Sequence, residues 1–333
     1  MMIRYLFIFV FLVISELLYF KLAQKLRIVD KPNERSSHST IVIRGGGIVF
    51  LLGIWMWSIV FGFHYPWLLL AVSMAAGTSF MDDIYSLPDS IRLIVHFVAI
   101  LLLFYEVQLY QWDVWWFFLI ALIVCVGAMN IFNFMDGING MTGGYSLVVL
   151  IPLMILNHRI HFVEESLLVF IGISLLVFCF FNFRTKAKCF SGDVGSIGIA
   201  TLLLFAIGKL IMKTGDITWF VFLIVYGVDG CLTIIHRIML HEKLGTAHRK
   251  HVYQLLANEL SVPHIGVSVI YMCIQLFISS VMIFVIPDTF LSHWLYMCGT
   301  ILVLSLLYIF FMKKYYHFHS EYLESLNNKL KNK

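Results

Sequence analysis

Long apolar runs, each close to the length that crosses a lipid bilayer, alternate with short polar loops along the whole chain. A membrane-spanning helix needs about 20 predominantly apolar residues, with a range of about 17–25. Eleven runs are of this kind, and we expect approximate spans at residues 3–22, 46–63, 66–82, 91–106, 114–130, 141–157, 166–183, 194–212, 217–235, 264–286 and 291–312. The pattern predicts an all-α, polytopic integral membrane protein with about eleven transmembrane helices.

The composition indicates that lipid surrounds most of the chain. Of its 333 residues, 61% are hydrophobic and only 13% are charged, whereas soluble domains carry about 25% charged residues. The first apolar run is followed by Lys21-Leu22-Ala23-Gln24 instead of a small-residue cleavage site, so we expect it to remain as a span. Because no long linker or internal repeat interrupts the pattern, we expect residues 1–312 to form one transmembrane domain and residues 313–333 a short cytoplasmic tail.

The distribution of positive charge predicts the orientation, because cytoplasmic loops carry the excess of lysine and arginine. Only four of the 23 lysines and arginines, at the N-terminus and at Arg159, Lys209 and Lys213, lie on one side of the predicted spans. The others lie in the loops after odd-numbered spans and in the tail. We therefore expect an outside N-terminus and a cytoplasmic C-terminus. No basic stripe with interleaved aromatic residues indicates binding of nucleic acid.

Polar residues gather on the same, cytoplasmic side. The segments rich in carboxylates, histidines and glycines are residues 30–47, 82–92, 130–144, 182–196 and 236–251. The outer loops, such as His64-Tyr65-Pro66, are short and carry no dense cluster. A structural protein has no need for such a gathering, and a transporter more often places ionisable groups near the middle of the membrane. The pattern indicates a functional site on the cytoplasmic face.

Two of these segments end spans with acidic groups. Asp82 and Asp83 close the third span, where a cation would relieve the repulsion between adjacent carboxylates; from this pair alone, a hydrated span terminus is an equal alternative. The segment Asn133-Phe134-Met135-Asp136-Gly137-Ile138-Asn139-Gly140 closes the fifth span. Its polar side chains at Asn133, Asp136 and Asn139 would share a helix face if the helix continued, and its glycines would let a ligand approach the backbone.

Two other segments begin spans with glycines. Ser191-Gly192-Asp193-Val194-Gly195-Ser196 opens the eighth span, where free backbone N–H groups favour a phosphate and Asp193 offers a hard oxygen ligand for Mg²⁺. Arg44-Gly45-Gly46-Gly47 opens the second span and places a guanidinium beside backbone amides that we expect to be exposed. This arrangement predicts a cradle for a diphosphate.

Three further features leave alternatives open. The first is a basic loop, Ala247-His248-Arg249-Lys250-His251-Val252-Tyr253-Gln254. This loop could bind an anion or transfer a proton. Alternatively, it could be an interfacial helix that touches lipid headgroups. Glu16 and Asp229 lie inside predicted spans, which makes both of them functional candidates. Asp229 could equally pair with Arg237, and the sequence provides no place for Glu16.

The ordered motifs resemble those of the polyprenyl-phosphate N-acetylhexosamine-1-phosphate transferase family, bacterial glycosyltransferase family 4. The resemblance runs from about residue 27 to about residue 256 and rests on MDD, NFMDGING, SGDVGS and the late histidine-containing loop. One branch of the family starts the synthesis of O-antigen or related surface polysaccharides. The early part of this chain is similar to that branch in the segment Asp30-Lys31-Pro32-Asn33-Glu34-Arg35-Ser36-Ser37-His38, followed by Arg44-Gly45-Gly46-Gly47.

The resemblance implies a role for each motif residue. It implies that the catalytic residues are Asp82, Asp83, Asp136 and His251, and that Asp193, with Asp136, binds Mg²⁺. Together with the sequence features above, it leads us to expect that the substrate-binding residues are Asn133, Asn139, His38, Arg44, Gly45, Gly46, His248 and Arg249. Two departures stand out: many relatives have a second Asp in place of Asn139, and the late loop lacks three consecutive histidines.

The resemblance also implies the reaction. A sugar 1-phosphate of the N-acetylhexosamine type would pass from a UDP-sugar to undecaprenyl or another polyprenyl phosphate, with release of UMP, at the cytoplasmic face of the bacterial inner membrane. Mg²⁺, for which Mn²⁺ could substitute, would bridge the diphosphate. The implied partners are UDP-N-acetylhexosamine, the lipid carrier and the membrane, and the sequence is compatible with a homodimer.

Two other classes of protein are alternatives. A secondary transporter of an anionic solute would have polar residues on both faces and helix breaks near the middle of the membrane. An intramembrane aspartyl protease would need two aspartates deep within spans. In this sequence the acidic motifs lie at span ends, which favours the transferase.

Overall fold

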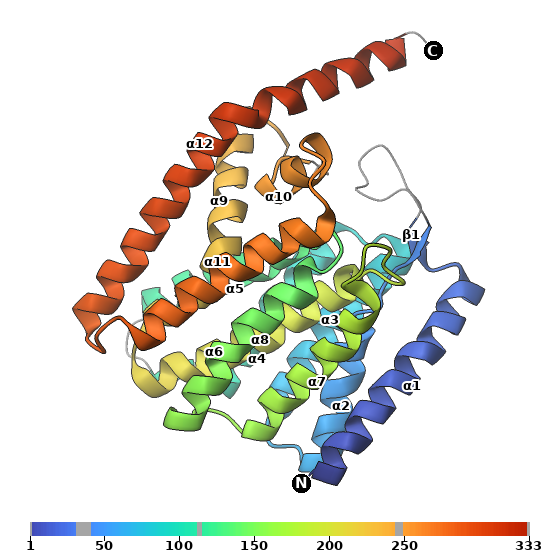
Figure 1. The fold of residues 1–333 in the computed structure, drawn as a ribbon. Coiled ribbons are helices and arrows are strands. Elements are labelled where there is room, and N and C mark those ends of the chain that lie inside the picture. Colours follow the sequence, from blue (N-terminus) through green and yellow to red (C-terminus); the bar gives the residue numbers. More distant parts are fainter. Residues whose placement is uncertain (1, 31–40, 112–114, 244–248, 332–333) are drawn as a thin grey trace.

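The structure is a computed structural model that describes residues 2–30, 41–111, 115–243 and 249–331. These residues form a bundle of helices with one small pair of strands (Figure 1). In chain order the elements are α1 (Met2–Leu26), β1 (Val29–Asp30), β2 (Val42–Ile43), α2 (Ile48–Phe61), α3 (Pro66–Tyr85), α4 (Asp89–Glu106), η1 (Leu109–Gln111), α5 (Trp115–Met135), α6 (Met141–Ile160), α7 (Glu165–Asn182), α8 (Gly192–Thr214), η2 (Ile217–Leu223), α9 (Ile224–Met239), α10 (Val252–Gln254), η3 (Leu255–Glu259), α11 (His264–Phe284) and α12 (Phe290–Lys331).

Every predicted span coincides with a helix. Within the described ranges, eight helices are long and apolar enough to cross a membrane: α1, α5, α6, α7, α8, η2 together with α9, α11 and α12. The helix α2 is apolar but has only 14 residues, and α3 and α4 carry charged side chains in their end turns. The prediction of a nearly all-α membrane protein is confirmed, whereas the count of eleven crossings and the orientation remain predictions.

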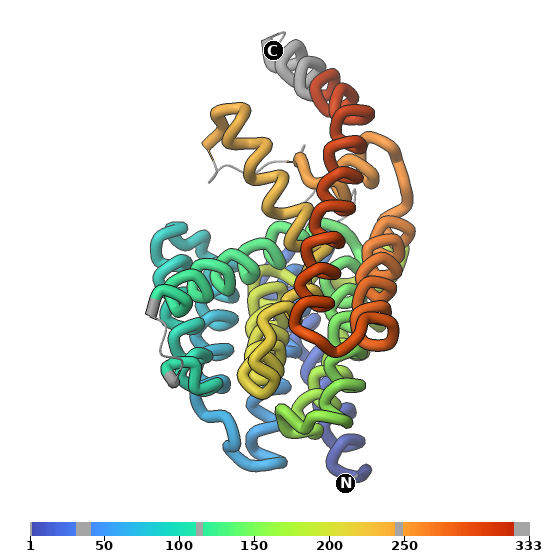
Figure 2. The backbone as a smooth tube through the Cα atoms, turned by 90° about the vertical axis from the view of Figure 1, so that its left-hand side faces the viewer, coloured from blue at the N-terminus to red at the C-terminus, as the bar shows by residue number. Residues whose placement is uncertain are grey.

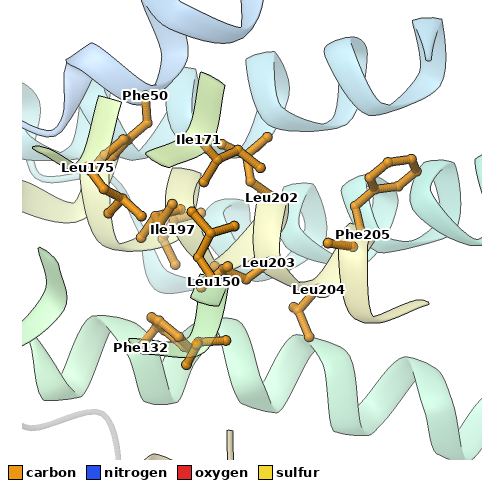
Figure 3. Close-up of a cluster of buried hydrophobic side chains, with 14 of the residues drawn as sticks. Phe50, Phe132, Leu150, Ile171, Leu175, Ile197, Leu202, Leu203, Leu204 and Phe205 are labelled. Carbon is orange, nitrogen blue, oxygen red and sulfur yellow. The ribbon is translucent and has the colours of Figure 1, made fainter. Parts of the chain in front are cut away.

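The helix α8 forms the centre of the bundle. It packs against α2, α3, α5 and α6, and nearly all of its residues are buried. In contrast, most of the membrane-length part of α12 is exposed, on the outside of the bundle. Figure 3 shows side chains of α8 among those of its neighbours, with the labelled residues being Phe50, Phe132, Leu150, Ile171, Leu175, Ile197, Leu202, Leu203, Leu204 and Phe205. This central position lets the first turn of α8 meet residues from several other helices.

One end of the bundle is built differently from the other. At this end α9 and α12 extend beyond the other helices, and the short elements α10 and η3 lie beside them (Figures 1 and 2). The residues expected to form a separate tail continue α12 as far as Lys331. Because α12 packs against α9, α10 and η3, this long helix supports the segment that contains His251.

The strands β1 and β2 form a short antiparallel ladder that the sequence pattern did not predict. Val29 is paired with Ile43, and Asp30 with Val42. Ile43 also bridges to Cys189, and its carbonyl accepts a hydrogen bond of 2.8 Å from the Phe190 N–H. The ladder therefore joins the segment before α2 to the segment before α8.

Candidate active site

The carboxylate of Asp83, at the end of α3, caps the first turn of α8. One oxygen, Oδ1, accepts a hydrogen bond of 3.1 Å from the Asp193 N–H, and Oδ2 accepts one of 3.2 Å from the Val194 N–H. The N-terminus of a helix favours an anion because its first N–H groups lack partners within the helix. The sequence predicted a phosphate at this terminus; in the structure the Asp83 carboxylate accepts hydrogen bonds there, and the binding of a phosphate stays a prediction.

Two arginines connect the acidic residues. Arg44 Nε lies 2.7 Å from Asp83 Oδ1, and its Nη2 lies 3.4 Å from Asp193 Oδ1. Arg92 Nη1 lies 2.7 Å from Asp82 Oδ2 and 3.2 Å from Asp193 Oδ2. Asp193 is thus held between two guanidinium groups, and the predicted catalytic pair and the predicted metal ligand belong to one cluster.

The glycines of the two glycine-containing motifs allow these motifs to touch. A Cβ atom on Gly47 would lie 2.1 Å from the Gly195 Cα, and one on Gly192 would lie 2.8 Å from the backbone of Gly45. The amides of Gly46 and Gly47 donate to the carbonyls of Phe190 and Ser191, at 2.8 and 3.0 Å. These two amides are therefore not exposed as the sequence suggested, and the binding of substrate by Arg44, Gly45 and Gly46 stays a prediction.

Asp136 lies just beyond the end of α5 and faces the same cluster. Its Oδ1 accepts a hydrogen bond of 2.7 Å from the Thr142 hydroxyl. Burial raises the pKa of Asp136 to about 7, and the nearby charges of Asp193 and Asp83 add to the rise although the Thr142 hydrogen bond opposes it. From the last turn of α5, the Asn133 side chain hydrogen-bonds to Asp193. Asn133 and Asp136 therefore lie beside the predicted metal ligand.

Asn139 has a different environment from the one that the spacing suggested. Because α5 ends at Met135, the shared helix face does not extend to Asn139. The Asn139 side-chain amide instead donates to the carbonyls of Arg184 and Thr185, at 2.9 and 3.2 Å. In this position Asn139 stabilises the turn after α7, and its expected contact with the nucleotide stays a prediction.

His251 is buried against α9 instead of lying among lipid headgroups. Only 1% of the residue is exposed, and Nδ1 lies 3.3 Å from Asp229 Oδ1. The Asp229 carboxylate also accepts hydrogen bonds from the Val252 N–H and the Tyr271 hydroxyl, at 3.2 and 2.6 Å. The interpretation of this part of the loop as an interfacial helix is wrong, and so is the alternative pairing of Asp229 with Arg237, which contacts Glu242 instead.

Tyr253 joins the late loop to the predicted catalytic segment. Its hydroxyl donates a hydrogen bond of 2.8 Å to the Phe134 carbonyl, and its ring lies so close to Gly137 that a Cβ there would be 2.2 Å from the hydroxyl oxygen. The His251 ring lies 6.4 Å from the Phe134 ring, centroid to centroid. The structure therefore places His251 beside the turn that carries Asp136.

Some predicted residues lie elsewhere. Arg249 faces η3 and α12, where it lies 3.7 Å from Glu259 and contacts Tyr322. Glu16, which the sequence did not place, lies behind the glycines of the Arg44 motif, 3.6 Å from the Cys189 sulfur. His38 and His248 lie outside the described residues.

The sequence did not point to Arg92, nor to the hydroxyls of Thr142 and Tyr253 that support the site. Arg92 lies ten residues after Asp82, beyond a turn in which the Leu87 N–H donates to Asp82 Oδ1 at 2.6 Å. The available signal was a lone arginine near the start of a predicted span, which ordinarily marks only a membrane boundary. Its contact with Asp193, 101 residues away in the sequence, could not be read from that signal.

The carboxylates of this centre offer the hard oxygen donors that a divalent cation prefers. Mg²⁺ prefers oxygen ligands and commonly uses one or two carboxylates together with substrate phosphates and water. Asp193 and Asp136 provide such carboxylates. Burial is the main cause of the raised pKa of Asp136, and the negative charges of Asp193 and Asp83, which a cation would offset, add to it. Among the described residues, no three histidine, cysteine, aspartate or glutamate side chains form a group that could hold a metal ion.

These features define a class of protein: a helical integral membrane protein with an aspartate and arginine centre where several helix ends meet. The family model described as glycosyl transferase family 4 matches residues 65–211, which include α3, α5, the first turn of α8 and therefore most of this centre. Over these residues the chain is similar to glycosyl transferase family 4.

Named relatives agree with this assignment. The probable undecaprenyl-phosphate N-acetylglucosaminyl 1-phosphate transferase of Bacillus subtilis (strain 168) is 27% identical over 274 residues, which cover 76% of each chain. The undecaprenyl-phosphate alpha-N-acetylglucosaminyl 1-phosphate transferase of Salmonella typhi is 27% identical over 62% of this chain and 60% of its own length. The phospho-N-acetylmuramoyl-pentapeptide-transferase of Thermotoga maritima is 38% identical over 26% of this chain and 28% of its own length.

Proposed function

We propose that the protein transfers a sugar 1-phosphate of the N-acetylhexosamine type from a UDP-sugar to a polyprenyl phosphate and releases UMP. The match of residues 65–211 to glycosyl transferase family 4 and the names of the relatives support this reaction. The product would remain in the membrane and begin the synthesis of a surface polysaccharide. The fold agrees with a lipid acceptor, because the acidic centre lies at the ends of helices that are long and apolar enough to cross a bilayer.

The convergence of Asp82, Asp83 and Asp193 with Arg44 and Arg92 is the observation that carries the proposal. The reaction brings an anionic lipid phosphate close to an anionic diphosphate. Two guanidinium groups can bind phosphate oxygens in place of, or beside, their carboxylate partners. Bound Mg²⁺ would supply further positive charge at the phosphates.

The contacts of Asp83 and Asp82 support a single displacement by the lipid phosphate. Both oxygens of Asp83 accept hydrogen bonds from α8, and one of them also contacts Arg44. Asp82 accepts from the Leu87 N–H with one oxygen and contacts Arg92 with the other. A carboxylate held in this way is a poor nucleophile, so we assign Asp82 and Asp83 to holding the arginines and the α8 terminus in place.

We place this centre on the cytoplasmic face of a bacterial inner membrane. The excess of lysine and arginine in the loops at the same ends of the helices supports this orientation. A transporter or an intramembrane aspartyl protease would need ionisable groups near the middle of the helices. Asp83 lies instead in the last turn of α3, and Asp193 lies in the first turn of α8.

The test is to incubate the purified protein with polyprenyl phosphate, Mg²⁺ and a panel of UDP-N-acetylhexosamines. Release of UMP that requires the lipid identifies both the reaction and the donor. An arm with EDTA should abolish UMP release, and added Mg²⁺ or Mn²⁺ should restore it. Full turnover in metal-free buffer would contradict the role of the cation, and no UMP from any donor would contradict the reaction.

A further inference from the structure

His96 on α4 is a buried histidine whose two ring nitrogens have no hydrogen-bond partner among the described residues. Only 4% of the residue is exposed. An imidazole always has at least one N–H donor, and buried polar atoms without partners are uncommon because each keeps the cost of losing its hydrogen bonds to water. The role of His96 in the packing of α4 does not explain why a histidine is present at this position.

Arg92 lies one helical turn before His96, on the same face of α4. Residues four apart on a helix are neighbours, and the charge of Arg92 acts on the His96 ring. Arg92 Nη1 contacts Asp82 and Asp193, while its Nε is buried and has no partner within the part of the chain that the structure describes. A patch with unused hydrogen-bonding capacity therefore begins at the acidic centre and continues along α4.

The same face of α4 continues into an apolar cavity. Beyond His96, the buried side chains of Ala99, Ile100 and Leu103 follow at helical spacing. Ile100 and Leu103 line a cavity of about 410 Å³ between α4, α5, α8, η2 and α12. The opposite face of α4 is exposed and apolar at Ile94, Val98 and Leu101, so α4 lies at the edge of the bundle.

We propose that Arg92 and His96 form the binding site for the phosphate of the lipid acceptor, with the first part of its apolar chain directed along α4 towards this cavity. The assignment rests on the proposed function and extends it to a particular helix face. A phosphate oxygen accepts hydrogen bonds from the Arg92 Nε–H and from an N–H of His96. An attacking phosphate at this position lies next to Asp82 and Asp193.

The position of His96 distinguishes the acceptor from the nucleotide donor. His96 lies in the third turn of a helix of 18 residues, next to apolar side chains and away from the polar loops. An ionic group bound there needs an apolar attachment that can enter between the helices, which a lipid monophosphate has and a UDP-sugar lacks. The donor is left with the more polar surroundings of Asn133, Asp136 and Asp193.

Thermal stabilisation of the full-length protein in detergent by farnesyl phosphate tests the site without turnover. Farnesol, inorganic phosphate and dioleoyl phosphatidic acid serve as comparison probes. The wild type should be stabilised by farnesyl phosphate and far less by the other three. His96→Phe, which keeps the ring but removes its nitrogens, should lose the stabilisation, whereas His96→Gln, which keeps an N–H donor, should retain most of it.

The kinetic arm separates the two substrates. In His96→Phe the KM for polyprenyl phosphate should rise about tenfold, the factor that corresponds to one lost hydrogen bond to a charged group, with the KM for the UDP-sugar within about twofold of the wild type. His293→Phe is the matched control, because His293 is also buried but contacts Asp216 on the far side of the bundle. This control should leave both KM values unchanged even where it lowers the melting temperature.

Equal stabilisation of wild type and His96→Phe by farnesyl phosphate would overturn the assignment. Equal effects of inorganic phosphate or phosphatidic acid on the wild type would also overturn it, in favour of a free anion or a membrane phospholipid. If His96→Phe does not fold, His96→Leu gives the same two measurements, with the same expected result. A wild type that binds farnesyl phosphate through His96 but releases no UMP would refute the proposed function and leave the site standing.

Discussion

The side chain of Asp83 and the backbone of Asp193, 110 residues apart in the sequence, are joined by a hydrogen bond of 3.1 Å. This bond places the end of α3 against the start of α8, and Arg44 completes the arrangement from the segment before α2. Three motifs that are separated by long apolar runs thereby form one centre. We expect the stability of that centre and its chemistry to depend on the same carboxylate.

Replacement of Asp83 by asparagine should destabilise the protein and abolish its activity. The side-chain amide group that replaces one carboxylate oxygen would face a backbone N–H or Arg44, and one buried hydrogen bond would be lost. We expect a decrease of about 2 kcal/mol in the free energy of unfolding, in the range for a buried polar group left without its partner. Asp89→Asn is the control, since the Asp89 side chain is 71% exposed and should change stability by less than about 0.5 kcal/mol. Chemical denaturation in detergent measures both, and equal stability of the two variants would contradict the capping role.

Asp193→Asn should lose activity while the protein still inserts and folds. The change removes the negative charge that we expect to bind the cation, and it keeps the shape of the side chain. We expect UMP release to fall about a hundredfold or more, as for the loss of several kcal/mol of charge stabilisation. Glu164→Gln, at an exposed position before α7, should be nearly silent. Equal losses in both variants at matched expression would contradict the location of the site.

Asp136→Asn should make the metal-free protein more stable than the wild type, by a margin that is small near pH 5 and largest at alkaline pH. Folding raises the pKa of Asp136 from 3.8 to about 7, so the folded state retains a proton that the unfolded state has released. Stability therefore falls as the pH rises from about 4 to about 7, and the full cost is present above pH 7. The variant avoids this cost because an amide does not ionise.

Melting temperatures of wild type and Asp136→Asn in EDTA, taken from pH 5 to pH 9, provide the measurement. The difference between the two proteins should grow with pH up to about 8 and then level off. A constant difference across this range would mean that Asp136 does not titrate as its surroundings indicate. We expect the stabilised variant to be inactive, in line with the common trade-off between stability and activity at charged sites.

A reporter fused to the C-terminus should behave as cytoplasmic. The prediction follows from the eleven predicted spans together with the excess of lysine and arginine in loops of one parity. A phosphatase that is active only outside the cytoplasm and a fluorescent protein that folds only inside it form a suitable pair. Activity of the phosphatase fusion would contradict the count of eleven crossings or the orientation.

Exchange of labelled UMP into UDP-sugar should not occur when the carrier lipid is rigorously removed. A single displacement needs the lipid phosphate for any bond to the sugar-linked phosphorus to break. A covalent enzyme intermediate would allow the exchange without lipid, as in ping-pong kinetics. Exchange at a rate comparable to turnover would refute the single displacement and would make Asp82 or Asp83 the candidate nucleophile.

The sequence alone was sufficient to locate the long apolar helices and to select the segments that form the site, but not to show that α12 continues to Lys331. Each apolar run became a helix because a backbone surrounded by lipid must satisfy its hydrogen bonds internally. The sequence placed three motifs on one membrane side, because their loops all lie at the same side of the predicted spans. In the structure these motifs do lie together: Asp82 with Asp83, Asn133 with Asp136, and the residues around Asp193. The long separation between the motifs did not prevent this prediction. Each end of a membrane-spanning helix lies at one of only two membrane surfaces, so counting the spans is enough to group the motifs.

Only the tertiary structure decided which groups contact one another. Three contacts depend on how helices distant in the sequence pack together. They are the contact of Arg92 with Asp193, that of His251 with Asp229, and that of Asn139 with the turn after α7. Apolar periodicity reports which residues avoid water, but lipid and protein interiors are equally apolar, so it does not distinguish a lipid-facing side from a packed one. The pairing of polar groups then follows from how the helices pack, and no local pattern of residues encodes it.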